Sequence, residues 1–329
     1  MNGEELRRLF QRLSDTSPPT EGSYAAVEIP ASGGHMAFLA ANGTLGLLLN
    51  TSQDGPAPPR IRLSGLDALF GVRCVVSVGG GAPLERRMTV LSCTATTDLR
   101  PLFAEFGGTF LRLLGRSPSM EDASSTVARF AALLSSLTQP SRQSVTGLIG
   151  ELMLLLLASD PVAAVACWRR SPGDKFDFVA PDARVECKAA SAGVRVHTFS
   201  WEQANPPDGP ALVASLFVEA TGGGTSVREL VDRIEARLSG APEAAAKLRE
   251  TVASTMGAAL FEALDARFDE AACRASLRWF DLRQVPAIRG VLPPGVWNVR
   301  LTSDLGLVNP VAPACLTSTG LEGLAPPGA

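Results

Sequence analysis

Two short β-type runs, at residues 176–179 and 184–189, constrain the fold of this chain most, because the turn between them sets their register. The intervening Ala-Pro-Asp-Ala contains a Pro-Asp pair, which is typical of turns, so the runs are expected to form a hairpin. A turn centred on Pro-Asp predicts three cross-strand pairs: Val179 with Arg184, Phe178 with Val185, and Asp177 with Glu186.

The charged residues of this hairpin share one face. Side chains alternate along a strand, so Lys188 lies on the same face as Asp177 and Glu186, whereas Phe178 and Cys187 take the opposite, apolar face. Two carboxylates opposite each other repel and would destabilise a purely structural hairpin. We therefore expect a cationic group between them.

A third carboxylate is expected to approach from a helix. This helix begins at Ser141 or Ser144 and carries Glu151, whose neighbours at helical spacing are leucine and alanine. A charge on such an apolar face needs a partner. Gly147 and Gly150 lower helix propensity but let another backbone approach the same side closely.

Length and composition indicate an ordinary globular protein. The 329 residues suffice for two domains or one elaborated α/β domain. The strongest apolar run, 152–158, is too short to span a bilayer, and the N-terminus has no secretory pattern, so a cytoplasmic location without membrane contact is expected. The six cysteines lack paired metal-type spacing, which predicts reduced thiols, no disulfides and no zinc.

The charge distribution gives two opposing indications. The net charge of −3 provides no global basic field and counts against DNA binding. However, only three of the 30 basic residues are lysines (Lys175, Lys188 and Lys247), and two of these lie beside the Asp177/Glu186 pair. Lysine at these positions of an arginine-rich chain suggests that the site needs a compact ammonium charge, which a planar guanidinium cannot replace.

The remaining pattern predicts a β-rich N-terminal half and a helix-rich continuation. A helix is expected at 3–13, and six β runs between residues 23 and 95 predict a mainly antiparallel sheet. Helices follow at 98–114 and 120–137, and Asp160-Pro161 is expected to end the Glu151 helix. Further expected elements are strands at 194–199, 211–219, 274–282 and 295–301, a helix from Ser200, a loop at 222–224, and helices at 226–238 and 242–268.

Several residues have competing interpretations. The strand, glycine run and helix around 222–224 resemble a phosphate loop but lack its Gly-Lys-Ser/Thr ending, so an ordinary connection is favoured. His35 is interpreted as a structural or surface histidine and Cys187 as a small core residue. Asp174 lies in a turn and ranks behind Asp177 as a metal ligand. An isolated Glu186/Lys188 pair would more often be an edge-strand ion pair.

The spacing of Asp177 and Glu186-Cys-Lys188 resembles the D…(D/E)-x-K signature of the PD-(D/E)XK, or restriction-endonuclease-like, nuclease superfamily. The whole chain more narrowly resembles the bacterial "PD-(D/E)XK motif protein" family of restriction-modification and phage-defence gene clusters. Phe176 replaces the proline that precedes the signature aspartate. The resemblance is best from 141 to 238, and its matching residues are Gly147-Leu-Ile-Gly-Glu151-Leu, Phe176-Asp177-Phe, Val185-Glu186-Cys-Lys188 and Arg195-x-His197-x-Phe199-Ser200-x-x-Gln203.

The resemblance implies an α/β fold of the α+β kind with a mixed sheet: a restriction-endonuclease-like core preceded by a β-rich N-terminal module. The expected division is a β-rich module at 1–96, connecting helices at 97–140, and a nuclease-like domain with a C-terminal helical and strand extension at 141–329.

The resemblance also implies a role for each residue of the site. Asp177 and Glu186 would hold Mg²⁺, with Mn²⁺ as a substitute and the backbone carbonyl of Cys187 as a further ligand. Lys188 would orient or deprotonate the attacking water, and Glu151 would hold a second metal or a metal-bound water. Three further residues would contact the substrate phosphate or backbone: Gln203, His197 and Arg195.

Three functions are compatible with these features. The first is a metal-dependent DNA endonuclease in restriction-modification or phage defence. The second is a catalytically weak DNA-binding or scaffolding subunit of a defence complex, and the third is a phosphodiesterase acting on RNA or nucleotides, for which no dedicated feature is present. The expected partner is DNA, and both a homodimer and other subunits of a restriction or defence system remain open.

Overall fold

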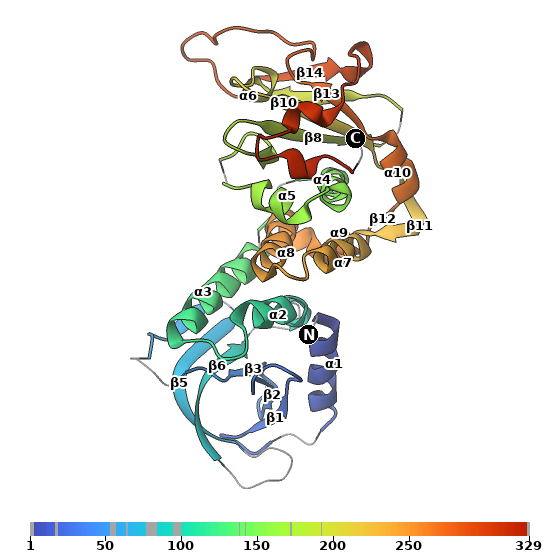
Figure 1. The fold of residues 1–329 in the computed structure, drawn as a ribbon. Coiled ribbons are helices and arrows are strands. Elements are labelled where there is room, and N and C mark those ends of the chain that lie inside the picture. Colours follow the sequence, from blue (N-terminus) through green and yellow to red (C-terminus); the bar gives the residue numbers. More distant parts are fainter. Residues whose placement is uncertain are drawn as a thin grey trace. The chain divides into compact units, whose positions relative to one another are not determined.

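The computed structural model divides into two compact units, residues 1–139 and 140–329 (Figure 1). It describes residues 3–16, 19–52, 57–63, 65–76, 84–94, 100–137, 139–141, 143–171, 173–191 and 193–327. Across these ranges, no helix has both the length and the apolar character needed to cross a membrane.

Unit 1 contains a six-stranded antiparallel sheet, as the β runs predicted. The strand order is β1-β2-β3-β6-β5-β4. The strands are β1 (Tyr24–Glu28), β2 (Met36–Ala40), β3 (Leu45–Leu49), β4 (Ile61–Leu63), β5 (Leu66–Val76) and β6 (Leu84–Cys93).

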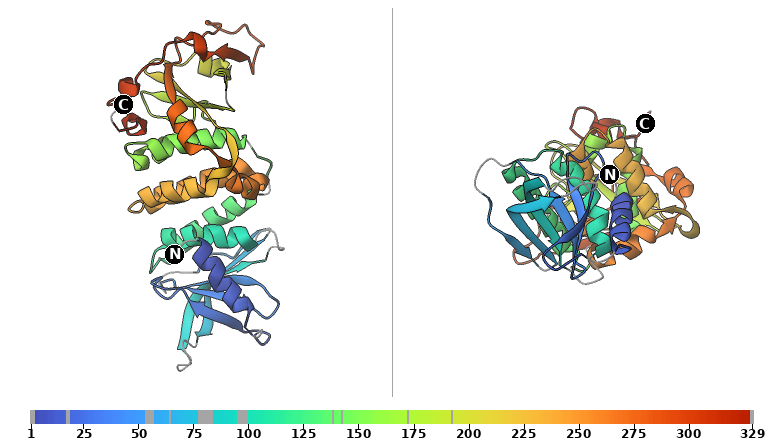
Figure 2. Two further views of the ribbon diagram at one scale, coloured as in Figure 1. Left: turned by 90° about the vertical axis from the view of Figure 1, so that its right-hand side faces the viewer. Right: turned by 90° about the horizontal axis from the view of Figure 1, so that it is seen from below.

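Three helices complete unit 1: α1 (Gly3–Ser14), α2 (Arg100–Leu114) and α3 (Met120–Ser136). The helix α1 contacts α2 and β2, and α3 contacts α2 and β5 (Figures 1 and 2). Phe103 and Phe110 of α2 both pack on Phe130 of α3, with ring centroids 5.6 and 4.9 Å apart. The helices α2 and α3 therefore belong to the same compact unit as the N-terminal sheet.

Unit 2 is built on a mixed four-stranded sheet with the order β13-β10-β8-β7. Only β8 and β10 pair in parallel, and the two outer pairs are antiparallel. The strands are β7 (Phe178–Val179), β8 (Arg184–Ala190), β10 (Ala211–Phe217) and β13 (Arg278–Asp281). Together with its helices, this sheet gives the α+β fold that was expected.

One face of this sheet is covered by α4 (Val145–Leu157), which contacts β8 on one side and α7 (Val227–Arg237) and α8 (Pro242–Met256) on the other (Figures 1 and 2). Ser144 caps α4, because its Oγ accepts a hydrogen bond from the backbone N–H of Gly147. A Cβ added to Gly150 would lie 2.9 Å from Ala189 Cβ and 3.0 Å from Cys187 Sγ. Glycine at this position therefore allows α4 to approach β8 closely.

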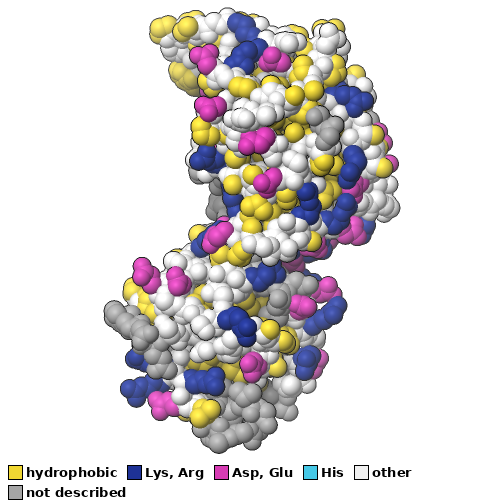
Figure 3. Space-filling view, in the orientation of Figure 1, with side chains coloured by type: hydrophobic (Ala, Val, Ile, Leu, Met, Phe, Trp, Pro, Cys, Tyr) yellow, Lys and Arg dark blue, Asp and Glu magenta, His cyan; other side chains and the backbone are white. Residues whose placement is uncertain are grey.

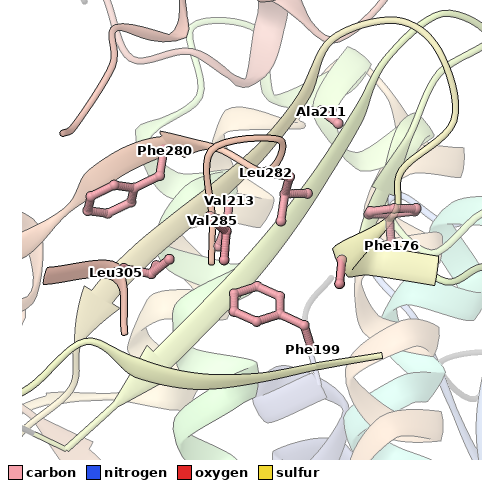
Figure 4. Packing of buried hydrophobic residues seen from close by; sticks show 9 residues of the cluster. Phe176, Phe199, Ala211, Val213, Phe280, Leu282, Val285 and Leu305 are labelled. Carbon is pink, nitrogen blue, oxygen red and sulfur yellow. The ribbon is translucent and has the colours of Figure 1, made fainter. Parts of the chain in front are cut away.

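The other face of the sheet is covered by β9 (Val196–Ser200), which pairs antiparallel with β14 (Arg300–Asp304). A buried hydrophobic cluster fills the space between β9 and the sheet, with side chains from several elements pointing into it (Figure 4). Its members include Phe176, Phe199, Val213, Phe280, Leu282 and Leu305.

Some predicted elements were wrong or misplaced. Asp160-Pro161 was expected only to end the Glu151 helix, but it also begins a second helix, α5 (Pro161–Cys167). Asp160 Oδ1 caps α5 by accepting hydrogen bonds from two backbone N–H groups. The expected loop at 222–224 belongs to β11 (Ala220–Ser226), which pairs with β12 (Arg267–Phe268).

The expected helix 242–268 is interrupted at Gly257, whose φ of +49° is incompatible with a right-handed helix. After this glycine come η1 (Gly257–Ala259) and α9 (Leu260–Asp265). Residues 274–276 end α10 (Glu270–Ser276) instead of starting a strand, and the last expected strand lies later, in β14. The remaining elements are α6 (Trp201–Ala204), η2 (Leu305–Leu307), η3 (Pro313–Leu316) and η4 (Glu322–Leu324).

Candidate functional site

The β7–β8 hairpin has the register that its turn predicted, with Phe178 opposite Val185 and Val179 opposite Arg184. Asp177 directly precedes β7. Its Oδ2 accepts a hydrogen bond of 2.9 Å from the backbone N–H of Cys187. The hairpin thus brings Asp177 to the edge of β8 beside Glu186.

Glu186 and Lys188 lie together on the β9 side of the sheet. Lys188 Nζ is 2.7 Å from Glu186 Oε1, and the two side chains are 19% and 5% exposed. The same ammonium lies 5.2 Å from the centroid of the Phe199 ring. Glu186 Oε2 is buried and has no hydrogen-bond partner among the described residues. One oxygen of this carboxylate is therefore paired, and the other is available to a ligand.

The electrostatics of the two acids indicate unmet negative charge. Burial, followed by repulsion from Glu151 and Glu186, raises the pKa of Asp177 well above its ordinary value. Burial also raises the pKa of Glu186, although the attraction of Lys188 opposes this change. A cation between the two carboxylates would relieve both effects.

The backbone at Cys187 adds a third oxygen to this arrangement. Arg184 donates its backbone N–H to Pro210 O on the β10 side, whereas Cys187 donates its own to Asp177 on the other side. The N–H and C=O of one strand residue point to the same side, so the Cys187 carbonyl also points towards Asp177. The Cys187 side chain is buried on the α4 face, and burial raises the pKa of its thiol well above the ordinary value.

These oxygens fit a divalent cation of the hard type. Mg²⁺ prefers oxygen ligands, keeps several waters and is usually held by one or two carboxylates. Asp177, Glu186 Oε2 and the Cys187 carbonyl form such a set. Within the described ranges, no group of three or more His, Cys, Asp or Glu side chains is arranged to hold a metal. Metal binding here would thus depend on two carboxylates, one carbonyl and water.

Glu151 reaches the same region but is engaged with protein donors. It is fully buried and accepts hydrogen bonds from Gln143 Nε2 at 2.7 Å, from Trp168 Nε1 at 2.6 Å, and from Arg169 Nε and Nη2 at 2.8 and 2.6 Å. Arg169 Nη2 also lies 3.6 Å from Asp177 Oδ1. The guanidinium therefore faces both carboxylates.

The sequence did not reveal Gln143, Trp168 or Arg169 as parts of the site. The only signal was indirect: Glu151 on an apolar face required a partner, but nothing in the spacing identified it. Trp168 and Arg169 follow α5, the helix that was missed, and a bridge between Trp168 and Phe178 places them beside the hairpin.

The three residues expected to contact phosphate are all hydrogen-bonded within the protein. Gln203 completes a capping box with Ser200, and its Nε2 donates to Lys175 O at 2.8 Å. Arg195 Nη1 donates to the backbone and hydroxyl oxygens of Ser215 at 2.7 and 2.8 Å.

His197 is also held by Ser215. Its Nε2 lies 2.8 Å from Ser215 Oγ. Burial, followed by repulsion from Lys188 and Arg195, lowers the pKa of His197 to about 4. Lys188 and Arg195 thus both lie near the His197 ring and oppose its protonation.

Two alternative candidates have local roles. Asp174 accepts a hydrogen bond of 2.8 Å from the backbone N–H of Ser171 and so closes a turn. His35 is buried in unit 1, where its Nδ1 accepts the Asn50 backbone N–H at 2.9 Å and its Nε2 lies 2.9 Å from Gly115 O. His35 is therefore a structural histidine.

The chain is similar to a known protein family. The model of the family described as "Putative PD-(D/E)XK family member, (DUF4420)" matches residues 6–306. No curated protein and no solved structure matches the chain.

Proposed function

We propose that this protein is a metal-dependent DNA endonuclease, because the chain belongs to the PD-(D/E)XK family and its hairpin presents a carboxylate pair suited to a divalent cation. The family match supports a nuclease-like α+β fold. The observation that carries the proposal is the buried Glu186 Oε2, which lacks a hydrogen-bond partner among the described residues although it lies beside Asp177 and Lys188. Such an orphaned anionic oxygen needs a ligand.

The site residues have distinct tasks in this proposal. Asp177, Glu186 and the Cys187 carbonyl would hold Mg²⁺ or Mn²⁺, which neutralises phosphoryl charge and makes bound water more acidic. Lys188 is held by Glu186 at 2.7 Å and orients the attacking water. Glu151 acts through Arg169, which it fixes beside Asp177.

The proposed substrate is DNA, and the proposed setting is restriction-modification or phage defence. The setting rests on the resemblance to defence-associated proteins. The face in Figure 3 carries basic and acidic side chains interspersed, and the net charge of the chain is only −3. Recognition of a polyanion would therefore rely on local contacts near the site more than on a global field.

A second candidate is a DNA-binding or scaffolding subunit with little catalysis. Its support is the pairing of Glu151 with Arg169, which withdraws one of the three acids from metal binding. Incubating the full-length protein with supercoiled and linear plasmid in Mg²⁺, Mn²⁺ or EDTA separates the two candidates. Nicking or linearisation that EDTA abolishes supports the endonuclease. DNA binding without cleavage in either metal would support the scaffolding role.

A further inference from the structure

Glu151 has no acceptor capacity left for a metal ion. An ionised carboxylate offers about four lone-pair positions. Oε1 accepts hydrogen bonds from Gln143 and Arg169, and Oε2 accepts them from Trp168 and Arg169. Both oxygens are therefore saturated by buried or partly buried donors, and a metal ion could bind Glu151 only if one of these bonds broke.

Arg169 is fixed at both its side chain and its backbone. Its guanidinium donates two hydrogen bonds to Glu151 and another to Gln143 Oε1. The two bonds to one carboxylate form a planar bidentate pair, which fixes the orientation of the arginine. Its backbone N–H donates to Asp177 O at 2.8 Å. Its φ of +42° lies in the left-handed region, where a non-glycine residue persists only if its surroundings hold it.

This anchoring places positive charge between two carboxylates, those of Glu151 and Asp177. Arg169 Nη2 is 3.6 Å from Asp177 Oδ1 while it also binds Glu151. A guanidinium stays protonated in proteins, so Arg169 contributes a permanent positive charge at this position.

The charges at the site favour one divalent ion over two. The three carboxylates of Asp177, Glu186 and Glu151 face the two cations Arg169 and Lys188, which leaves one negative charge. One divalent ion reverses this to one positive charge, which suits an anionic phosphodiester. A second ion would leave three positive charges in a partly buried site and would repel Arg169.

We propose that the Asp177/Glu186 pair binds a single divalent cation and that Arg169, locked by Glu151, supplies the second positive charge beside Asp177. This inference rests on the proposed metal-dependent function and specifies its ion count. Arg169 acts on the site through its fixed position, and Glu151 is its positioning residue, not a metal ligand.

The direct test is the Mn²⁺ stoichiometry of the full-length protein without DNA. Isothermal titration calorimetry should give one ion per chain, and electron paramagnetic resonance should show the spectrum of an isolated ion. Glu151→Gln should still bind one ion with affinity within a few-fold of the wild type. Asp177→Asn should lower the affinity for Mn²⁺ by at least about 10-fold. Circular dichroism checks that each variant is folded.

Each outcome bears on the proposal. Two ions in the wild type, with the second lost in Glu151→Gln, would overturn the single-ion inference but leave the nuclease proposal intact. No Mn²⁺ binding to the wild type would overturn both. The wild-type ion count decides the question even if Glu151→Gln fails to fold, because the inference predicts that count without any variant.

Discussion

His197 offers the most quantitative prediction, because its surroundings hold it neutral far below the ordinary histidine pKa. The ring is buried, it contacts Ser215 Oγ, and Lys188 and Arg195 lie close enough to repel a proton. Its pKa is lowered from 6.5 to about 4. We predict that His197 carries no charge at neutral pH and so cannot act as a cation towards phosphate.

The lowered pKa has a definite consequence for stability. As the pH falls below 6.5, His197 becomes protonated in the unfolded chain but stays neutral in the folded chain. Protonation therefore favours the unfolded state, and the free energy of unfolding declines. A change in pKa from 6.5 to about 4 corresponds to a total loss of about 3 kcal/mol, completed below pH 4. About 1.4 kcal/mol of this loss is reached by pH 5.5, whereas almost none is present at pH 7.5.

Histidine ring NMR measures this pKa directly. The chain has only two histidines, so a spectrum of ring-labelled protein contains two signals, and His35→Gln assigns them. The His197 signal should stay unchanged from pH 7.5 to 5.5. Between pH 7.5 and 5.5, urea unfolding should show that the free energy of unfolding falls by about 1.4 kcal/mol more in the wild type than in His197→Gln. A His197 signal that titrates near pH 6.5 would refute the argument.

Three further predictions concern the elements around the site. Gly150→Ala should lower the free energy of unfolding by roughly 1–2 kcal/mol, because overpacking against Ala189 and Cys187 costs about 1–3 kcal/mol and the gain in helix propensity is at most about 1 kcal/mol. Urea unfolding at wild-type stability would contradict the α4–β8 packing. Lys188→Arg should impair single-turnover cleavage nearly as much as Lys188→Ala, since a forked guanidinium cannot hold one water as an ammonium does. Cleavage near the wild-type rate in Lys188→Arg would instead make Lys188 a structural partner of Glu186. Asp177→Asn should raise the stability of the metal-free protein at pH 7, because an acid whose folded pKa is raised destabilises the fold above its unfolded pKa. A melting temperature below that of the wild type in EDTA would contradict this sign.

The parts of the site that sequence could predict are those fixed by local rules. A Pro-Asp turn and a period of two were enough to place Phe178 opposite Val185, and Glu151 was correctly expected to be buried and to need a partner. These features depend on residues close in sequence, so periodicity and turn chemistry determine them.

The parts that could not be predicted depend on tertiary packing. Arg169 meets Glu151 only because α5 returns the chain to the hairpin edge, and the Asp-Pro pair before α5 can either end one helix or begin the next. Likewise, the break at Gly257 follows from a positive φ that a run of alanine-rich sequence does not reveal. His197 and Arg195 share the partner Ser215, which lies on a different strand and so could not be identified from local spacing.

Metal-dependent cleavage of DNA by the Asp177/Glu186 pair can be measured directly. The most direct measurement is plasmid cleavage in Mn²⁺ by the wild type, by Glu186→Gln, and by Glu219→Gln, which makes the same chemical change at an exposed carboxylate of the same unit. We expect Glu186→Gln to lose cleavage while remaining folded, Glu219→Gln to cleave like the wild type, and EDTA to abolish all cleavage. Undiminished cleavage by Glu186→Gln, or cleavage that persists in EDTA, would show that this carboxylate pair does not hold a catalytic metal.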